Sequence, residues 1–581
     1  MPVYEQKPEI KIKNFNQVYE GYDEIVAELL TKLNSIKKKE VILAVECYPG
    51  VSYKEVLTNL IDALHPKRVF ISDEYFIDPN TMNELLIPIL TEDKVFGIMS
   101  HYEFSDFLDE KKKNYLQEEI NGLSGLIVIL GTGASVLYEQ PDVMIYADLS
   151  RWEIQLRHRN GMGNWNADNE HESIKKKYKR GFFFEWRTAD RLKQKVYHHI
   201  DYLLDTTLQN DPKMLSGGDY RQALREVVQQ PFRLVPYFDT SVWGGQWMKE
   251  RFNLEPTSVN YGWGFDGVPE ENSIIINVDG VKIEIPSINL VFAYPKELLG
   301  EKVYAQFGKE FPIRFDFLDT VRGGNLSLQV HPLVDYIQDK YGMLYTQDES
   351  YYILSSGEKS SIYLGLKKDI NMEELEQDLR KSERGNYRFP DEKYVNHFPV
   401  KRHDHYSIPA GTIHCSGPDT VVLEISATPY IFTFKLWDWG RMDLDGQPRP
   451  IHLNQGLENI QVDRDTDWVE INLIHSFKGV PELGDEEHEV EKTGLHELEF
   501  IETKRHWFKG SAMIENHDGF NMLNLVDGEK ITVESLDGKF QPFEVHYAET
   551  FIVPATIQKY KLVNQGDLNQ PVAVIQAYVR N

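Results

Sequence analysis

The segment Leu326–Ser350 reads LSLQVHPLVDYIQDKYGMLYTQDES, and residues 407–417 read SIPAGTIHCSG. In the LQVH part of the first segment, alternation along a strand would place the glutamine and the histidine on one face. A tyrosine-rich strand then begins next to a glutamate, and a Pro-Ala-Gly turn in the second segment precedes another histidine. Imidazole and carboxylate groups bind borderline divalent ions such as zinc. We therefore predict that strands of a small barrel bring four metal ligands together: Gln329, His331, Glu349 and His414.

Several motifs together resemble the class I (type I) mannose-6-phosphate isomerases of the cupin superfamily. Besides QVHP and IPAGTIH, the sequence has VWGG at 242–245, FPIRFDFLD at 311–319 and DWGR at 438–441. The order and spacing of these motifs are similar to those of that family from about residue 231 to residue 581. The resemblance implies a mainly-β double cupin (jelly-roll) architecture with a small helical insertion. A metal-binding cupin would span 231–465, and a C-terminal cupin without metal would span 466–581.

The same resemblance implies an activity. It predicts a metal-dependent aldose–ketose isomerase that interconverts mannose 6-phosphate and fructose 6-phosphate through an enediol intermediate. Zinc is the expected ion, although manganese, cobalt and iron accept the same ligands. By its position in the motifs, Glu424 would transfer a proton or orient the substrate. Arg441 would bind the phosphate or another charged group of the substrate. The alternative for Arg441 is an ion pair with Asp438 or Asp443.

The sequence departs from the family at residues that would handle the substrate. Gln347 stands where the family has a lysine, two residues before the metal-binding glutamate. Lys435 corresponds to a catalytic arginine of the family if one residue is inserted, and residues 428–430 (TPY) replace an expected acidic residue. Lysine and arginine are not equivalent at a bidentate site. A second function therefore stays open: a non-catalytic cupin that binds a sugar or sugar phosphate, with a regulatory N-terminal domain.

The N-terminal part, residues 1–230, is expected to be a separate α/β domain that ends in a linker at 208–230. Apolar strands alternate with helical segments, which indicates a doubly wound sheet. The turn Tyr48-Pro49-Gly50 between a strand and a helix resembles the P-loop of uridine kinase-like and nucleoside-monophosphate-kinase-like proteins. Ser52 and Tyr53 replace the second glycine and the lysine, so the loop would be degenerate; an ordinary strand-to-helix turn is the alternative. The expected strands are 41–45, 69–73, 94–98, 126–130 and 143–148.

Composition narrows the functional classes. The chain has 581 residues, of which 41% are hydrophobic and 12% aromatic, enough for about two to four domains. A net charge of −28 argues against general nucleic-acid binding and means that a sugar phosphate would need a local cluster of Lys and Arg. With two distant cysteines, Cys47 and Cys415, and neither a signal peptide nor a membrane span, the sequence predicts a cytoplasmic protein. The small-molecule substrate is what the family resemblance implies. A homodimer stays open.

Overall fold

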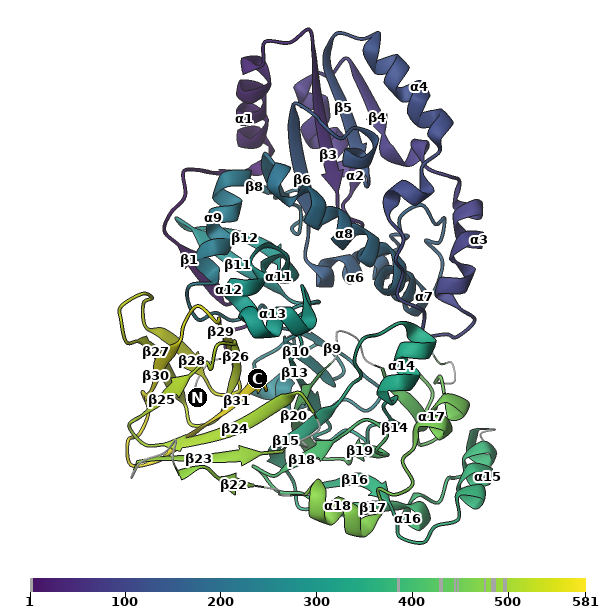
Figure 1. The fold of residues 1–581 in the computed structure, drawn as a ribbon, viewed down its shortest axis with the longest axis vertical. Helices are drawn as coiled ribbons and strands as arrows, with labels where there is room; N and C mark the ends of the chain where they lie inside the picture. Colours follow the sequence, from purple (N-terminus) through teal and green to yellow (C-terminus); the bar gives the residue numbers. More distant parts are fainter. Residues whose placement is uncertain are drawn as a thin grey trace. The chain divides into compact units, whose positions relative to one another are not determined.

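The computed structural model describes residues 4–383, 387–427, 432–443, 446, 449–474, 477–481, 487–494 and 499–580. The chain forms two compact units, and each consists of several sequence segments. Unit 1 comprises Met1–Pro8, Val228–Asn272 and Tyr294–Asn581. Unit 2 comprises Glu9–Val227 and Ser273–Ala293. The chain therefore passes between the units more than once, and each unit is described below by itself (Figure 1).

Unit 2 contains a 7-stranded sheet in the order β2-β8-β7-β6-β3-β5-β4. Strands β4, β5, β3, β6 and β7 are parallel to their neighbours, and β8 and β2 continue the sheet in antiparallel pairing. The central strands are buried along nearly their whole length, as parallel sheets covered on both faces require. The strands are β2 (Val18–Glu20), β3 (Glu40–Cys47), β4 (Arg68–Ile71), β5 (Gly125–Gly131), β6 (Val143–Asp148), β7 (Tyr202–Asp205) and β8 (Lys213–Ser216).

Helices alternate with these strands, which confirms an α/β sheet in this part of the chain. The buried face of the helix α1 includes Leu29 and Leu33, which are spaced about one turn apart. The helix α3 begins at an Asp78 cap whose carboxylate accepts from the Asn80 and Thr81 amides. The principal helices are α1 (Gly21–Ser35), α2 (Tyr53–Val56), α3 (Pro79–Leu90), α4 (Glu110–Asn121), α5 (Ala134–Leu137), α6 (Arg151–Arg159), α7 (Ile174–Arg180), α8 (Trp186–Val196) and α9 (Gly217–Val227).

Two local predictions for unit 2 were wrong. Residues 94–98 form no strand; the amides of Val95 and Phe96 instead donate to the Asp93 carboxylate, and Phe96 is buried as part of an irregular segment. A short apolar run is equally compatible with a buried loop, so periodicity could not separate the two. The region 208–230 is also not a loop throughout, because β8 and α9 lie within it and β8 pairs with β7.

A 3-stranded sheet, β1-β11-β12, joins distant segments within unit 2. The predicted hairpin is confirmed: β11 (Ser273–Val278) and β12 (Val281–Pro286) pair in antiparallel fashion around Asp279 and Gly280, both with positive φ. Strand β1 (Glu9–Ile12) pairs in parallel with β11. The helix α11 (Ile288–Ala293) follows the hairpin. This pairing explains why Ser273–Ala293 belongs to unit 2 although unit 1 surrounds it in sequence.

Unit 1 is mainly β, with two pairs of sheets. The first pair contains a 6-stranded sheet, β18-β15-β20-β13-β10-β9, and a 5-stranded sheet, β17-β16-β19-β14-β21. The predicted helical insertion is confirmed as α15 (Met372–Glu383), capped by Asn371. The strands are β9 (Tyr237–Asp239), β10 (Trp263–Gly267), β13 (Arg314–Asp319), β14 (Leu328–Val330), β15 (Glu349–Ser356), β16 (Ser361–Leu366), β17 (Val395–Pro399), β18 (His405–Ile408), β19 (His414–Ser416), β20 (Thr420–Ser426) and β21 (Phe434–Trp437). Shorter helices are α10 (Trp247–Arg251), α12 (Pro295–Leu299), α13 (Glu301–Phe307), α14 (Val334–Tyr341), α16 (Asp391–Tyr394), α17 (Leu453–Asn459) and α18 (Thr466–Asn472).

The second pair of sheets is C-terminal and encloses its own apolar core, which includes Leu523, Val533, Phe551 and Val574. Its 6-stranded sheet has the order β22-β23-β24-β31-β26-β29, and its 4-stranded sheet has the order β25-β30-β27-β28. The strands are β22 (Lys478–Gly479), β23 (His488–Thr493), β24 (Ile501–Phe508), β25 (Ser511–Glu515), β26 (Asn521–Asp527), β27 (Lys530–Ser535), β28 (Phe543–His546), β29 (Thr550–Val553), β30 (Lys559–Asn564) and β31 (Val572–Val579). Two sheets facing one another across a core are typical of sandwiches and jelly rolls.

Candidate metal centre

Three of the four predicted ligands meet at one point between the two sheets of the first pair. His331 directly follows β14, Glu349 is the first residue of β15, and His414 is the first residue of β19. One possible ligand atom from each lies within 4.8 Å of the others. All three side chains are fully buried, at 0% exposure. The structure thus brings together residues that are far apart in sequence and offers two imidazoles and one carboxylate to a single ion.

The ring orientation of both histidines is fixed by backbone carbonyls. Nδ1 of His331 lies 2.7 Å from the Phe432 carbonyl oxygen, and Nδ1 of His414 lies 2.9 Å from the Thr412 carbonyl oxygen. Because a carbonyl can only accept, each Nδ1–H donates, and each Nε2 faces the centre. The two Nε2 atoms lie 3.0 Å from separate oxygens of Glu349. This is the arrangement in which neutral imidazoles serve as metal ligands.

The charges of the three groups are coupled. Burial alone would raise the pKa of Glu349, but the facing His331 and His414 outweigh it and hold that pKa well below its ordinary value. Burial opposes the charged form of His331, and Glu349 reverses this effect and raises the pKa of the ring. Glu349 is therefore ionised at neutral pH, as a carboxylate ligand must be. The donor set fits a zinc-like divalent ion in type, and an ion bound there would replace the proton that Glu349 favours on His331.

Gln329 lies beside the triad. In β14 it is directly opposite His414 of β19 and Lys435 of β21. Its amide Nε2 lies 3.2 Å from Nε2 of His414, while its Oε1 accepts from Ser327 Oγ at 3.1 Å. Rotation of the amide group by half a turn would exchange the two atoms and direct the oxygen to the centre. The structure therefore places the Gln329 amide next to His414, and its role as a fourth ligand stays a prediction.

Gln347 connects the metal centre to Glu424. Its Nε2 donates to Glu349 Oε2 at 2.8 Å and to Glu424 Oε1 at 3.4 Å, and its Oε1 accepts from the Phe432 amide at 3.1 Å. From the sequence, Gln347 was only a departure from a family pattern; the structure shows it holding two carboxylates in place. Burial, followed by the charges of Asp316 and Glu349, raises the pKa of Glu424 well above its ordinary value.

The two predicted cationic residues have different surroundings. Lys435 is half-buried in β21, opposite Gln329 and therefore next to the centre. Arg441 donates to Asp438 Oδ1 and to the Asn325 carbonyl oxygen, which matches the ion-pair alternative. The catalytic roles of Lys435, Glu424 and Arg441 stay predictions. Residues 428–430, which replace an acidic residue of the family pattern, lie outside the described residues.

Sequence reasoning missed two charged residues beside the centre. Arg314 and Asp316 lie in β13, and both are buried, at 2% and 0% exposure. Asp316 pairs with Glu424 in the register of β13 and β20. Their signal was present in FPIRFDFLD at 311–319, because alternation puts the arginine and the first aspartate on one strand face.

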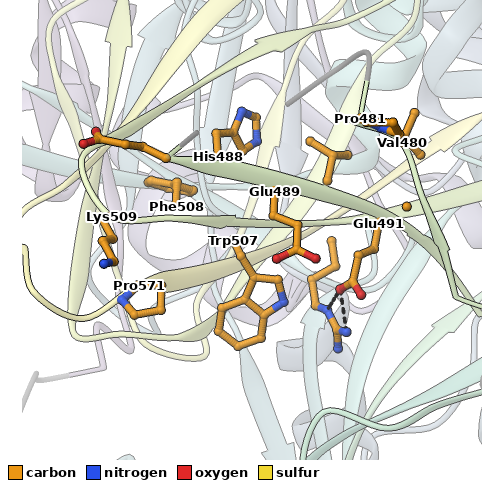
Figure 2. A pocket seen from close by; sticks show the side chains of 13 residues that line it. Val480, Pro481, His488, Glu489, Glu491, Trp507, Phe508, Lys509 and Pro571 are labelled. Carbon is orange, nitrogen blue, oxygen red and sulfur yellow. Dashed lines mark hydrogen bonds and ion pairs between the residues drawn. The ribbon is translucent and has the colours of Figure 1, made fainter. Parts of the chain in front are cut away.

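A separate pocket lies against the outer strands of the C-terminal sheets (Figure 2). Glu489, Trp507 and Lys509 line it, and Glu491 accepts there from Arg505 Nε and NH2 at 2.9 and 2.6 Å. None of the triad residues is among its lining. The metal centre is therefore not part of this pocket.

The predicted P-loop-like turn is occupied by the unit's own side chains. Gly50 has a φ of +104°, and a Cβ there would lie 2.9 Å from the Ile154 side chain. Arg157 NH1 donates to the Gly50 carbonyl at 2.9 Å, and Tyr53 OH donates to Thr132 Oγ1 at 2.8 Å. The glycine thus permits close packing of α6. The kinase-like character of the N-terminal part is not confirmed.

The chain is similar to several known proteins. A family model described as a domain of unknown function (DUF8485) matches residues 21–229. The mannose-6-phosphate isomerase of Streptococcus mutans serotype c is 24% identical over 342 residues, which cover 58% of this chain and 96% of that protein. The mannose-6-phosphate isomerase ManA of Bacillus subtilis is 23% identical over 305 residues, or 52% of this chain and 86% of that protein.

Among solved structures, the mannose 6-phosphate isomerase from Bacillus subtilis covers 60% of this chain and 99% of its own, with 18% identity and a TM-score of 0.48. A mutant form of the phosphomannose isomerase from Salmonella typhimurium covers 60% of this chain and 99% of its own, with 14% identity and a TM-score of 0.46. The resemblance inferred from the motifs is confirmed by the sequence relatives. No helix among the described residues is long and apolar enough to cross a membrane.

Proposed function

We propose that this chain is a metal-dependent aldose–ketose isomerase that interconverts mannose 6-phosphate and fructose 6-phosphate. The observation that carries the proposal is the buried His331–Glu349–His414 triad, with Gln329 beside it. Relatives named mannose-6-phosphate isomerase, 24% and 23% identical over more than half of the chain, support the choice of reaction.

The four predicted ligands would hold one divalent ion, and zinc is the first choice. Bound there, the ion would polarise neighbouring sugar oxygens and stabilise negative charge as the carbonyl becomes an enediol. The protein's own contribution is orientation: the Phe432 and Thr412 carbonyls hold both rings, and Gln347 holds the Glu349 carboxylate. Burial of the centre excludes bulk water and strengthens each of these electrostatic interactions.

Isomerisation also requires a group that moves a proton between C2 and C1 of the sugar. Glu424 is the best-placed candidate, because Gln347 links it to Glu349 and it lies in the strand next to β15. Burial raises its pKa well above the ordinary glutamate value and so favours the protonated form that a proton donor needs. Lys435, opposite Gln329, would stabilise negative charge on the substrate.

A coupled assay for mannose 6-phosphate isomerisation tests the proposal. Activity should disappear after chelation and return when zinc is restored. His414→Ala should abolish the metal-restored activity, whereas the matched change His397→Ala, at an exposed histidine of β17, should leave it unchanged. Protein shown to be fully loaded with metal but without activity would refute the isomerase.

A second function, a non-catalytic sugar-phosphate-binding cupin, is favoured by one observation. The amide nitrogen of Gln347 donates to both Glu349 and Glu424, and the side chain carries no charge that could bind a substrate. Metal-loaded protein that binds mannose 6-phosphate in calorimetry without turning it over would support this function over the isomerase.

A further inference from the structure

Asp316 is a buried carboxylate that makes no hydrogen bond with the residues the structure describes. It is at 0% exposure, and among the described residues neither of its oxygens has a hydrogen-bond partner. The charged nitrogen recorded closest to it, NH2 of Arg314, lies 3.9 Å from Oδ1, beyond hydrogen-bond distance. Buried polar groups are nearly always hydrogen-bonded in native proteins, so an exception of this kind needs an explanation.

The register of the strands directs Asp316 to the same side as the metal ligand. Glu349 of β15 lies opposite Ser426 of β20, and Asp316 of β13 lies opposite Glu424. Ser426 and Glu424 are two residues apart and share one face of β20. Asp316 and Glu349 therefore project from one face of one sheet, with Glu424 between their strands.

Asp319 in the same strand shows how this protein satisfies a structural carboxylate. It is also at 0% exposure, but its alternation places it on the opposite face of β13. Its oxygens accept from the Val321 amide at 2.9 Å and from the Met248 amide at 2.8 Å. Asp316 therefore differs, among the described residues, from the hydrogen-bonded carboxylate of the same strand.

We propose that Asp316, together with Glu424, forms a subsite that accepts hydrogen bonds from the hydroxyl groups of a sugar held at the metal centre. A carboxylate offers two acceptor oxygens, and neighbouring hydroxyls of a sugar offer two donors at matching spacing. The inference rests on the proposed function and deepens it by assigning the polyhydroxyl part of the substrate to this face.

Charge excludes the phosphate end from the same place. Asp316, Glu424 and Glu349 project from this face with Arg314 as the cation beside them. Because Glu349 is ionised, a phosphate would meet like charge there, whereas neutral hydroxyls would not. Burial, more than the opposing Arg314 charge, raises the pKa of Asp316 to about 7, and a carboxyl group in either protonation state can bind a hydroxyl.

The test compares Asp316→Asn, Asp316→Ala and the matched control Asp319→Asn in the full-length, zinc-loaded protein. Binding of sorbitol 6-phosphate, an open-chain polyol that cannot isomerise, is measured by calorimetry, with inorganic phosphate as the second probe. Loss of hydrogen bonds to a charged group should weaken sorbitol 6-phosphate binding about 10- to 100-fold in both Asp316 variants. Binding of inorganic phosphate should not change.

Thermal unfolding of the metal-free protein provides an independent readout. Both Asp316 variants should lower the unfolding midpoint less than Asp319→Asn does, because Asp316 has only the 3.9 Å ion pair with Arg314, whereas Asp319 accepts two backbone hydrogen bonds. The inference is overturned if the Asp316 variants unfold as early as Asp319→Asn, if neither Asp316 variant folds, if their polyol affinity is unchanged, or if the wild type binds no polyol. Polyol binding without isomerase activity would count against the proposed reaction and leave the subsite standing.

Discussion

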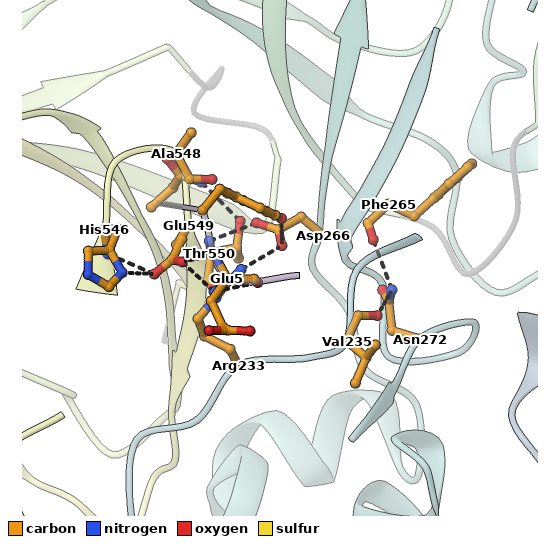
Figure 3. Close-up of polar contacts among 12 residues, drawn as sticks. Glu5, Arg233, Val235, Phe265, Asp266, Asn272, His546, Ala548, Glu549 and Thr550 are labelled. Atoms are coloured by element: carbon orange, nitrogen blue, oxygen red, sulfur yellow. Dashed lines mark hydrogen bonds and ion pairs between the residues drawn. The ribbon is translucent and has the colours of Figure 1, made fainter. Parts of the chain in front are cut away.

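Arg233→Met should destabilise unit 1 more than any surface substitution of the same kind. The Arg233 guanidinium pairs with Glu549 at 2.6 Å and with Asp266 at 3.4 Å, and donates to the Glu5 carbonyl at 3.0 Å (Figure 3). The three charged side chains are almost fully buried, at 2%, 1% and 0% exposure. Removal of the cation would leave two carboxylates buried without their partner. Breaking a buried pair in this way costs about 3–5 kcal/mol.

Three backbone amides report directly on this network. The Glu5 and His546 amides donate to Glu549, both at 2.7 Å, and the Thr550 amide donates to Asp266 at 2.7 Å. Hydrogen exchange at these amides should accelerate by about two to three orders of magnitude in Arg233→Met, because each 1.4 kcal/mol corresponds to about a tenfold change. Arg322→Met is the matched control, since its partner Glu250 is 64% exposed and such pairs contribute about 0–1 kcal/mol.

The effect should also depend on pH with a defined sign. Burial would raise the pKa of Glu549, but Arg233 outweighs it and lowers that pKa, so the wild type gains stability above the ordinary glutamate pKa and loses it on acidification. Burial already raises the pKa of Asp266 against the opposing charge of Arg233; without Arg233, burial would raise the pKa of Asp266 further and that of Glu549 as well, and stability would fall as pH rises. The difference between the two proteins should therefore be largest at pH 8 and shrink towards pH 5. Exchange rates equal to those of Arg322→Met, or a difference independent of pH, would refute the reasoning.

Three further outcomes are expected. Gly50→Ala should destabilise unit 2 by about 1 kcal/mol or more in urea unfolding measured without nucleotide. The added Cβ would lie 2.9 Å from the Ile154 side chain, and the φ of Gly50 is +104°. Unchanged stability would show that the turn is loosely packed. Asn289→Leu should cost about 1–3 kcal/mol, because Asn289 bonds Lys193 at 3.0 Å and Asp148 at 2.9 Å in a buried cluster, and a neutral result in the same assay would contradict this. Chelation should lower the unfolding midpoint of unit 1 and zinc should restore it, as linkage requires; a variant that lacks both metal-binding histidines should show neither shift.

The meeting of His331, Glu349 and His414 could be predicted because these residues lie in short segments with strong local signals. Alternation in LQVH fixes the faces of Gln329 and His331, and the Pro-Ala-Gly turn fixes where the strand of His414 begins. The sequence could not show that Gln347 joins Glu349 to Glu424, because that contact depends on the pairing of β15 with β20. From the sequence, Gln347 showed only that an uncharged residue stands where the family has a lysine.

Other features could not be predicted because they depend on long-range pairing. The hairpin at 273–286 was recognised from its Asp-Gly turn, but no local pattern indicates that β11 pairs with β1, more than 250 residues earlier. The 94–98 segment has the apolar composition of a strand, but in the folded chain it packs as an irregular segment after α3. Asp316 lies in a strand that was identified, yet its lack of a hydrogen bond among the described residues depends on how the folded strands pack around it.

The division of the chain into units has a consequence for any experiment on the N-terminal part. Tyr4 and Glu5 are bonded to Asp266 and Glu549 in unit 1, while the strand that begins at Glu9 pairs within unit 2. A fragment that ends near residue 230 would lose β11, and with it the partner of β1, and would also lose Asn289 from the buried Lys193–Asp148 pair. An exposed unpaired strand and an uncompensated buried cluster both favour unfolding and aggregation. Failure of such a fragment to bind a nucleotide would therefore report on its stability, and the role of unit 2 has to be measured in the intact chain.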